Sequence, residues 1–163
     1  SIFSIMWVKL SKIGKNPSIP LKFCFGIAQL ALGFLLTKLG YQFVNEAYQV
    51  PILTLVFLYM LHTTGELFLS PIGLSMVTKL SPKSMAGTAM GAWFLSFAIA
   101  NYVGGKIAAI TGGHGGSDEA LSVGEGLNQY LDIFSTIGYV LLGIALIIFL
   151  LNKPIKKLMH GVE

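Results

Sequence analysis

Arginine is absent from this sequence of 163 residues, and its eleven basic residues are all lysines. Charged residues of either sign make up 11% of the chain, less than half of what is usual for a soluble domain. Cysteine occurs once, at Cys24, which excludes an internal disulfide and a cysteine-based metal site. The scarcity of charge argues against an ordinary soluble fold.

Motifs of enzymes and metal proteins are also missing. The histidines His62, His114 and His160 are scattered, and they form neither a metal-ligand cluster nor part of a catalytic triad. The glycine-rich stretch 112–116 lacks the Lys-Ser/Thr of a phosphate-binding loop. The net charge of +4 comes from short lysine clusters between apolar runs, which are typical of membrane topology signals. We therefore expect no enzyme, no cofactor, no metal and no nucleic-acid partner.

Long apolar runs fill most of the chain. Hydrophobic residues make up 54% of it, and the mean hydropathy is +0.74. Four runs reach the ~20 residues that a helix needs to cross a bilayer, and none shows the period-2 alternation of a strand. The predicted spans are residues 21–40, 50–78, 85–111 and 132–151. The fold class predicted is all-α: a polytopic transmembrane helical bundle in contact with the lipid bilayer.

The connecting segments predict an orientation. Lysines gather in residues 9–22, 79–83 and 153–157, whereas the other loops carry acidic residues and no lysine. By the positive-inside rule the lysine-rich segments are cytoplasmic, including the C-terminal tail 152–163. The loop 112–131 is then extracytoplasmic. Residues 1–10 are apolar but too short to span, and we interpret them as the end of a truncated membrane helix.

Glu66 is the residue that points most directly to a function. It lies about 16 residues from the outer end of its span and about 13 from Lys79, roughly 20 Å from both ends. A carboxylate at that depth costs about 2.5 to 3.5 kcal/mol, so it should face protein or a water-filled cavity. Its partner is a proton, a substrate cation, a residue outside this sequence, or a polar group on a neighbouring helix. The structural alternative is a carboxylate held by hydrogen bonds between packed helices.

Three neighbours of Glu66 are further candidates for residues of a binding site. His62 and Ser70 lie four residues before and after it and extend one polar stripe. Pro71 removes a backbone hydrogen bond and predicts a kink, and transporters often place binding sites at such broken helices. The alternatives are a histidine bonded to a backbone carbonyl, a serine of the kind common in membrane helices, and a proline retained for packing.

The third span contributes Trp93 and Asn101. Trp93 falls inside the bilayer rather than at its interface, and Asn101, two turns on, is interpreted as sharing its face. A buried tryptophan can line a substrate cavity, but contact with lipid or the protein core is the more common role for such a residue. Asn101 is a candidate for the cavity or a gate. Gly87 and Gly91 form a small-xxx-small face that predicts close helix packing.

Three stretches resemble a known family. The run from Gly65 to Ser75, followed by Lys79-Leu80-Ser81-Pro82, resembles the tenth helix of the proton-dependent oligopeptide transporters, a branch of the major facilitator superfamily. Met85 to Phe94 resembles that family's eleventh helix, and Lys15-Asn16-Pro17-Ser18 resembles the linker between its eighth and ninth. The resemblance implies that the four spans are helices nine to twelve of a twelve-helix core, and that residues 1–10 end helix eight.

The same resemblance implies a function and a location. Members of the family import di- and tripeptides together with H+ as the coupling ion, across the cell (inner) membrane. Their helix-ten glutamate, which binds the amino terminus of the peptide, matches Glu66, while Ser70 and Trp93 match positions that line the same cavity. The part of helix ten after Pro71 corresponds to part of the cytoplasmic gate. The family's Glu-x-x-Glu-Arg motif and its helix-seven contacts lie outside this sequence, in N-terminal helices of the same transporter that would be its partners.

Two other functions remain as alternatives. One is a related transporter of another small solute, such as nitrate or a drug, although an anion fits poorly beside a mid-membrane carboxylate. The other is a non-transporting membrane receptor or scaffold, which predicts binding without accumulation and tolerance of changes at Glu66.

Overall fold

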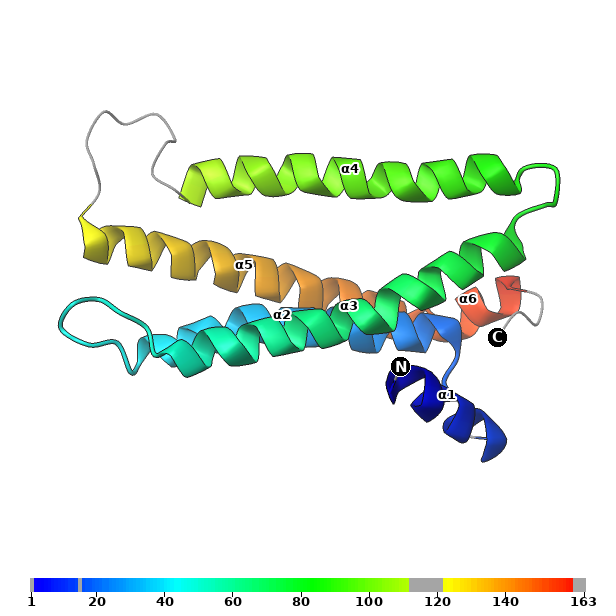
Figure 1. Cartoon of the computed structure of the whole chain (residues 1–163), viewed down its shortest axis with the longest axis horizontal. Coiled ribbons are helices and arrows are strands. Elements are labelled where there is room, and N and C mark those ends of the chain that lie inside the picture. Colours follow the sequence, from blue (N-terminus) through cyan, green and yellow to red (C-terminus); the bar gives the residue numbers. More distant parts are fainter. Residues whose placement is uncertain (1, 15, 112–121, 160–163) are drawn as a thin grey trace.

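The computed structural model describes residues 2–14, 16–111 and 122–159, and its regular elements over these residues are helices. In chain order they are α1 (Ile2–Lys12), α2 (Ile19–Tyr41), α3 (Ile52–Leu80), α4 (Ala86–Thr111), α5 (Val123–Leu150) and α6 (Asn152–Leu158). Helices α2 to α5 run along the length of a bundle, and the short α1 and α6 lie near one end of it (Figure 1). This arrangement confirms the all-helical fold class.

The helices that are long and apolar enough to cross a membrane are, among the described residues, α2, α3 and α5. Helix α4 occupies the predicted third span with 26 residues, and its crossing stays a prediction. Helices α2, α3 and α4 begin and end within two residues of the predicted ranges. By contrast, α5 begins inside the segment 112–131 predicted as a loop, and α6 lies within the predicted tail. Residues 112–121, with His114, and residues 160–163, with His160, lie outside the described residues.

The early start of α5 is explained by a capping box. The hydroxyl of Ser122 accepts a hydrogen bond from the amide of Glu125 at 3.3 Å, and the Glu125 carboxylate accepts one from the amide of Ser122 at 3.0 Å. These bonds satisfy amides that the first turn of a helix leaves without partners. The cap stabilises a helical turn in a stretch whose glycines and acidic residues suggested a loop.

Removal of this cap should loosen the start of α5. We expect Ser122→Ala to cost about 1 kcal/mol locally, so that amides 123–126 exchange with deuterium about fivefold faster in the full-length protein. Thr136→Ala, which removes a hydroxyl bonded only to the carbonyl of Asp132 on the same helix, is the control. Equal exchange at residues 123–126 in the Ser122→Ala variant and the unmodified protein would contradict the capping role.

Helix α2 packs extensively against both α3 and α5. Toward α3 two glycines allow the backbones to touch. A Cβ atom on Gly26 would lie 3.2 Å from the carbonyl oxygen of Gly65, and one on Gly65 would lie 3.1 Å from that of Gly26. Gln29 also hydrogen-bonds Thr64 across this contact. The small residues thus permit the close approach that helix pairs in membranes rely on.

The contact of α2 with α5 is equally close. Ala31 of α2 is fully buried, and a Cβ atom on Gly138 of α5 would lie 3.3 Å from its carbonyl oxygen. Nearer α6, the thiol of Cys24 donates a hydrogen bond to the carbonyl of Ala145 at 3.2 Å. These contacts join α2, α3 and α5 into one unit.

The turn between α2 and α3 is organised by Asn45. Its side-chain oxygen accepts hydrogen bonds from the amides of Ala47 and Gln49 at 3.1 and 2.9 Å. Tyr48 adopts a left-handed backbone with φ of 57°, and its ring contacts Gly124 in the first turn of α5. The turn is therefore folded on itself and also touches the start of α5.

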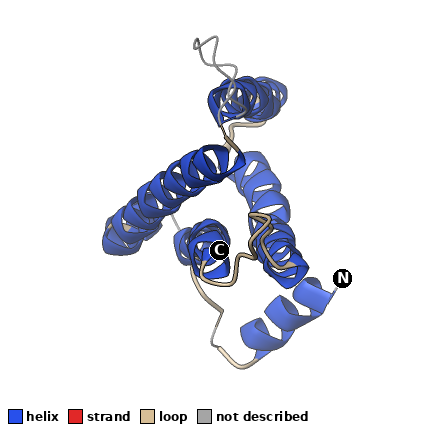
Figure 2. Ribbon diagram, turned by 90° about the vertical axis from the view of Figure 1, so that its left-hand side faces the viewer, coloured by secondary structure: helices blue, strands red, loops and turns tan. Residues whose placement is uncertain are grey.

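Helices α1 and α4 lie at opposite edges of the bundle (Figure 2). Helix α1 is anchored by Trp7, whose ring makes an edge contact with Phe68 at 5.3 Å and lies 4.9 Å from the ammonium group of Lys22. Helix α4 contacts α3 and α5 over short stretches, and most of its side chains are exposed. Nothing in the described chain lies within 4 Å of a Cβ atom placed on Gly87 or Gly91, so the packing predicted for these glycines is not found here.

Candidate functional site

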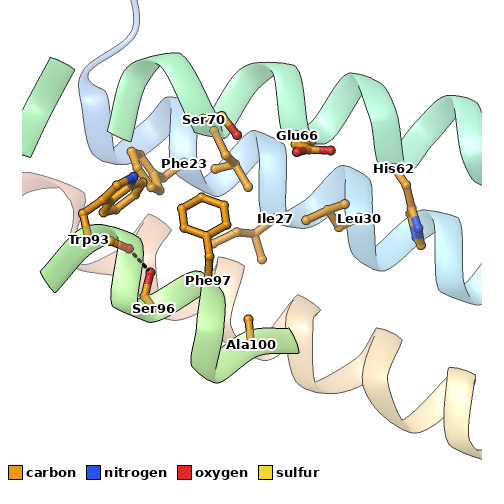
Figure 3. A pocket seen from close by; sticks show the side chains of 11 residues that line it. Phe23, Ile27, Leu30, His62, Glu66, Ser70, Trp93, Ser96, Phe97 and Ala100 are labelled. Carbon is orange, nitrogen blue, oxygen red and sulfur yellow. Dashed lines mark hydrogen bonds between the residues drawn. The ribbon is translucent and has the colours of Figure 1, made fainter. Parts of the chain in front are cut away.

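A cavity of about 610 Å³ lies between α2, α3 and α4 (Figure 3). It is lined by Phe23, Ile27 and Leu30 of α2, by His62, Glu66, Leu69 and Ser70 of α3, and by Trp93, Ser96, Phe97 and Ala100 of α4. The lining is mainly apolar and contains a few converging polar groups, which is the usual character of a small-molecule site. Its volume is also within the range of such sites.

The polar stripe of α3 forms one wall of this cavity. Side chains four residues apart on a helix lie on nearly the same face, so His62, Glu66 and Ser70 all reach the cavity. Trp93 comes from α4, on the other side (Figure 3). Four of the six candidate residues from the sequence are therefore brought together at one cavity.

Glu66 presents its carboxylate to this cavity as an exposed side chain. Among the described residues, no side chain forms a hydrogen bond or an ion pair with it, and no lysine lines the cavity. An apolar lining strengthens the attraction of an unpaired carboxylate for a cation, because the local dielectric constant is lower than that of water. The site can therefore attract a cationic group of a ligand.

His62 lies at the end of the cavity nearest the α2–α3 turn. Its ring centroid is 4.5 Å from that of Phe34, and a Cβ atom on Gly33 would lie 2.7 Å from Nε2 of the imidazole. This Nε2 atom is buried and has no hydrogen-bond partner in the described part of the chain. The ring thus fills a notch on α2 and combines a packing contact with a place in the cavity wall.

Trp93 closes the opposite end of the cavity. A Cβ atom on Gly73 would lie 2.5 Å from Cζ2 of the indole and 3.3 Å from Cζ of Phe23. On α4, the hydroxyl of Ser96 donates a hydrogen bond to the carbonyl of Trp93 at 2.6 Å, and the ring of Phe97 lies 6.1 Å away (Figure 3). The indole therefore spans the gap between α4 and α3.

Two candidates from the sequence lie outside the cavity lining. Pro71 is exposed, and α3 remains one helix through it. Asn101 is exposed too, and its side-chain amide donates a hydrogen bond to the carbonyl of Phe97 at 2.9 Å. Ala100 takes the place predicted for Asn101, because seven residues complete almost two helical turns whereas eight overshoot by about 80°.

The sequence reasoning missed most of the apolar lining. Phe97 and Ala100 follow Trp93 at the helical spacings i+4 and i+7, so this periodicity could have found them. The α2 side chains could not be found in this way, because their inclusion depends on how α2 packs against α3. Among the described residues, no group of three or more His, Cys, Asp or Glu side chains could hold a metal ion.

Helices that are long and apolar enough to cross a membrane are typical of a polytopic helical membrane protein, and here two of them, α2 and α3, line a largely apolar cavity with a carboxylate in its wall. A sequence model of the POT family matches residues 1–119. The chain belongs to the POT family, the proton-dependent oligopeptide transporters. This result confirms the resemblance seen in residues 65–82 and 85–94.

Curated relatives align with almost the entire chain. Dipeptide and tripeptide permease B of Aeromonas hydrophila subsp. hydrophila is 31% identical over 161 residues, which cover 98% of this chain and 32% of that protein. Dipeptide and tripeptide permease A of Yersinia pestis is 36% identical over 148 residues, or 91% of this chain and 29% of that protein. Uncharacterized transporter YclF of Bacillus subtilis is 34% identical over 161 residues, which cover 99% of this chain and 29% of that protein. The chain thus spans about a third of the length of the curated relatives it matches.

Proposed function

We propose that this chain is the C-terminal part of a symporter that imports di- and tripeptides together with protons, by alternating access across the cell membrane. In this proposal Glu66 pairs with the ammonium group of the peptide, and Ser70 and Trp93 line the space beside it. The proposal is carried by the Glu66 carboxylate, which lines a largely apolar cavity in a POT-family sequence and has no partner among the residues that the structure describes.

Several features of the chain support this assignment. The permease names of the relatives concern di- and tripeptides, and the matches cover more than nine-tenths of this chain. A zwitterionic peptide offers the cation that the cavity lacks. A transported anion such as nitrate would instead meet an uncompensated carboxylate.

The proposal assigns a direction to the bundle. The end that carries α1, α6 and the α3–α4 turn holds exposed lysines, among them Lys9, Lys83 and Lys153, and by the positive-inside rule it faces the cytoplasm. Upstream helices of the same transporter supply the rest of the cavity wall and the proton site. Rocking of the two halves then exposes Glu66 to each side of the membrane in turn.

Uptake by the full-length transporter in liposomes tests this function. An inward gradient of about two pH units stores about 2.7 kcal/mol per proton, enough to concentrate a neutral peptide about 100-fold. We expect accumulation of a labelled dipeptide that a protonophore abolishes. Unlabelled di- and tripeptides should compete, and nitrate should not. Binding of the peptide without gradient-driven accumulation would overturn the proposal in favour of a receptor.

A further inference from the structure

A small apolar cleft lies on the side of Phe23 that faces α6. Its volume is about 190 Å³, and it is lined by apolar side chains of α2, α3, α5 and α6, among them Phe23, Met76 and Met159. Phe23 also lines the larger cavity that contains Glu66, at the end where Trp93 lies (Figure 3). The half-buried ring of Phe23 is therefore a wall shared by the two spaces.

We propose that Phe23 is an adjustable wall of the peptide site, and that the cleft behind it favours peptides with a large apolar second side chain. The inference rests on the proposed function, in which Glu66 holds the ammonium group of the peptide. Phe23 contacts the substrate in this scheme. Met159, which follows α6, is a positioning residue that acts through Phe23 by limiting how far the ring can retreat.

The place of Phe23 relative to Glu66 points to the second residue of the peptide. The ring of Phe23 reaches α3 at Gly73, since its Cζ atom would lie 3.3 Å from a Cβ atom there. Gly73 follows Glu66 by seven residues, which is about 10 Å along the helix. One residue of an extended peptide spans about 3.5 Å. A long side chain on the second residue therefore approaches Phe23, whereas the first side chain stays beside Glu66.

The cleft can accept the ring because its lining is apolar. A phenyl ring carries no polar atom, so its movement among apolar side chains breaks no hydrogen bond. Close-packed interiors resist such movements, but a ring with a cleft on one side has few packing contacts to lose there. A bulky side chain of the substrate can thus push the Phe23 ring into the cleft, while a small one leaves the ring where it lies.

Helix α6 sets the size of the cleft because it is fixed to the rest of the bundle. At its first residue, the side-chain oxygen of Asn152 accepts a hydrogen bond from the hydroxyl of Ser18 at 2.6 Å. Ser18 is the N-cap residue of α2, yet its side chain caps no amide of that helix and bonds to α6 instead. Just past the last residue of α6, Met159 is only 5% exposed. The wall of the cleft opposite Phe23 is therefore held at both ends of α6.

Peptide affinities of the full-length transporter, measured without a pH gradient, test this wall. The quantity compared is the ratio of the affinity for Ala-Phe to the affinity for Ala-Ala. We expect Met159→Ala to raise this ratio about fivefold, because the ring of Phe23 can retreat further. Ile148→Phe, which fills the cleft from α5, should lower the ratio about fivefold. A variant that only damages the fold would weaken the binding of both peptides alike.

Three controls accompany these variants. Met159→Leu keeps the side chain about as large and should keep the ratio of the parent. Leu158→Ala truncates the adjacent side chain, which is 74% exposed and does not line the cleft, and it should also leave the ratio unchanged. In a Phe23→Ala background the wall itself is gone, so Met159→Ala should change the ratio by less than about twofold.

The results that would overturn the adjustable wall differ from those that would overturn the symporter. In a Met159→Ala or Ile148→Phe variant that still binds Ala-Ala, an unchanged ratio or a shift of the opposite sign would reject the wall and leave the symporter. An undiminished effect of Met159→Ala in the absence of Phe23 would do the same. The expected ratios in a protein that accumulates no peptide under a pH gradient would retain the wall and reject the symporter. Binding of neither peptide to the unmodified transporter would reject both.

Discussion

Glu66→Gln is expected to weaken peptide binding at least about thirtyfold and to abolish concentrative uptake by the full-length transporter. Glutamine has nearly the shape of glutamate but no charge, so the ammonium group of the peptide would enter a largely apolar cavity without a counter-charge. Truncation of one partner of such a charge pair costs about 2 to 5 kcal/mol. The measurement is dipeptide affinity, followed by uptake in liposomes under a pH gradient.

Two controls make this result specific. Glu46→Gln makes the same chemical change in the exposed α2–α3 turn and should leave both binding and uptake unaltered. A dipeptide with an acetylated amino terminus lacks the ammonium group, so it should bind the unmodified transporter weakly and lose little more in the Glu66→Gln variant. Equal losses for the free and the acetylated peptide would show that Glu66 does not contact the amino terminus.

Gly26→Val is expected to have the largest effect on stability. A Cβ atom at this position would lie 2.7 Å from Leu69 and 3.2 Å from the carbonyl oxygen of Gly65. The Leu69 side chain can change rotamer to relieve its contact, but the backbone oxygen cannot. Overpacking of a close contact costs about 1 to 3 kcal/mol for small additions, and a branched side chain adds more. We expect a fall in Tm of at least about 5 °C, or loss of monodisperse protein.

The matched control for this prediction is Gly143→Val in α5. The residue type and the substitution are the same, but a Cβ atom at Gly143 meets nothing within 4 Å in the described chain. Gly65→Val, on the other side of the contact, should reproduce the loss seen with Gly26→Val. A Tm that is equal in the Gly26 and Gly143 variants would show that the backbone contact does not limit stability.

Most of the helices could be predicted because the bilayer fixes their length. Apolar runs of about 20 residues are needed to cross it, and the chain breaks its runs with proline and lysine, as at Pro17, Pro82 and Lys83. The start of α5 was missed for a local reason. The composition of this stretch indicated a loop. Ser122 and Glu125, three residues apart, instead form a capping box that stabilises the first turn of the helix.

The sequence could predict which site residues share a face of one helix, but not which helices meet at the site. His62, Glu66 and Ser70 are four residues apart, which places them on one face of α3 regardless of which helices pack against it. The contact between Trp93 and Gly73 depends on the relative position of two helices, which spacing does not contain. Gly87 and Gly91 illustrate the same point, because their pattern indicates a close approach without naming the helix that approaches.

The turn held by Asn45 has a consequence for biogenesis. Its hydrogen bonds join residues at most four apart, so the α2–α3 hairpin can close as soon as both helices have left the ribosome. Helix α5 then has a preformed surface on α2 to dock against, and Tyr48 meets its first turn. Helix α4 is synthesised before α5, but of the four long helices it makes the fewest contacts with the others. We therefore expect α4 to reach its final position after α5, although it is translated first.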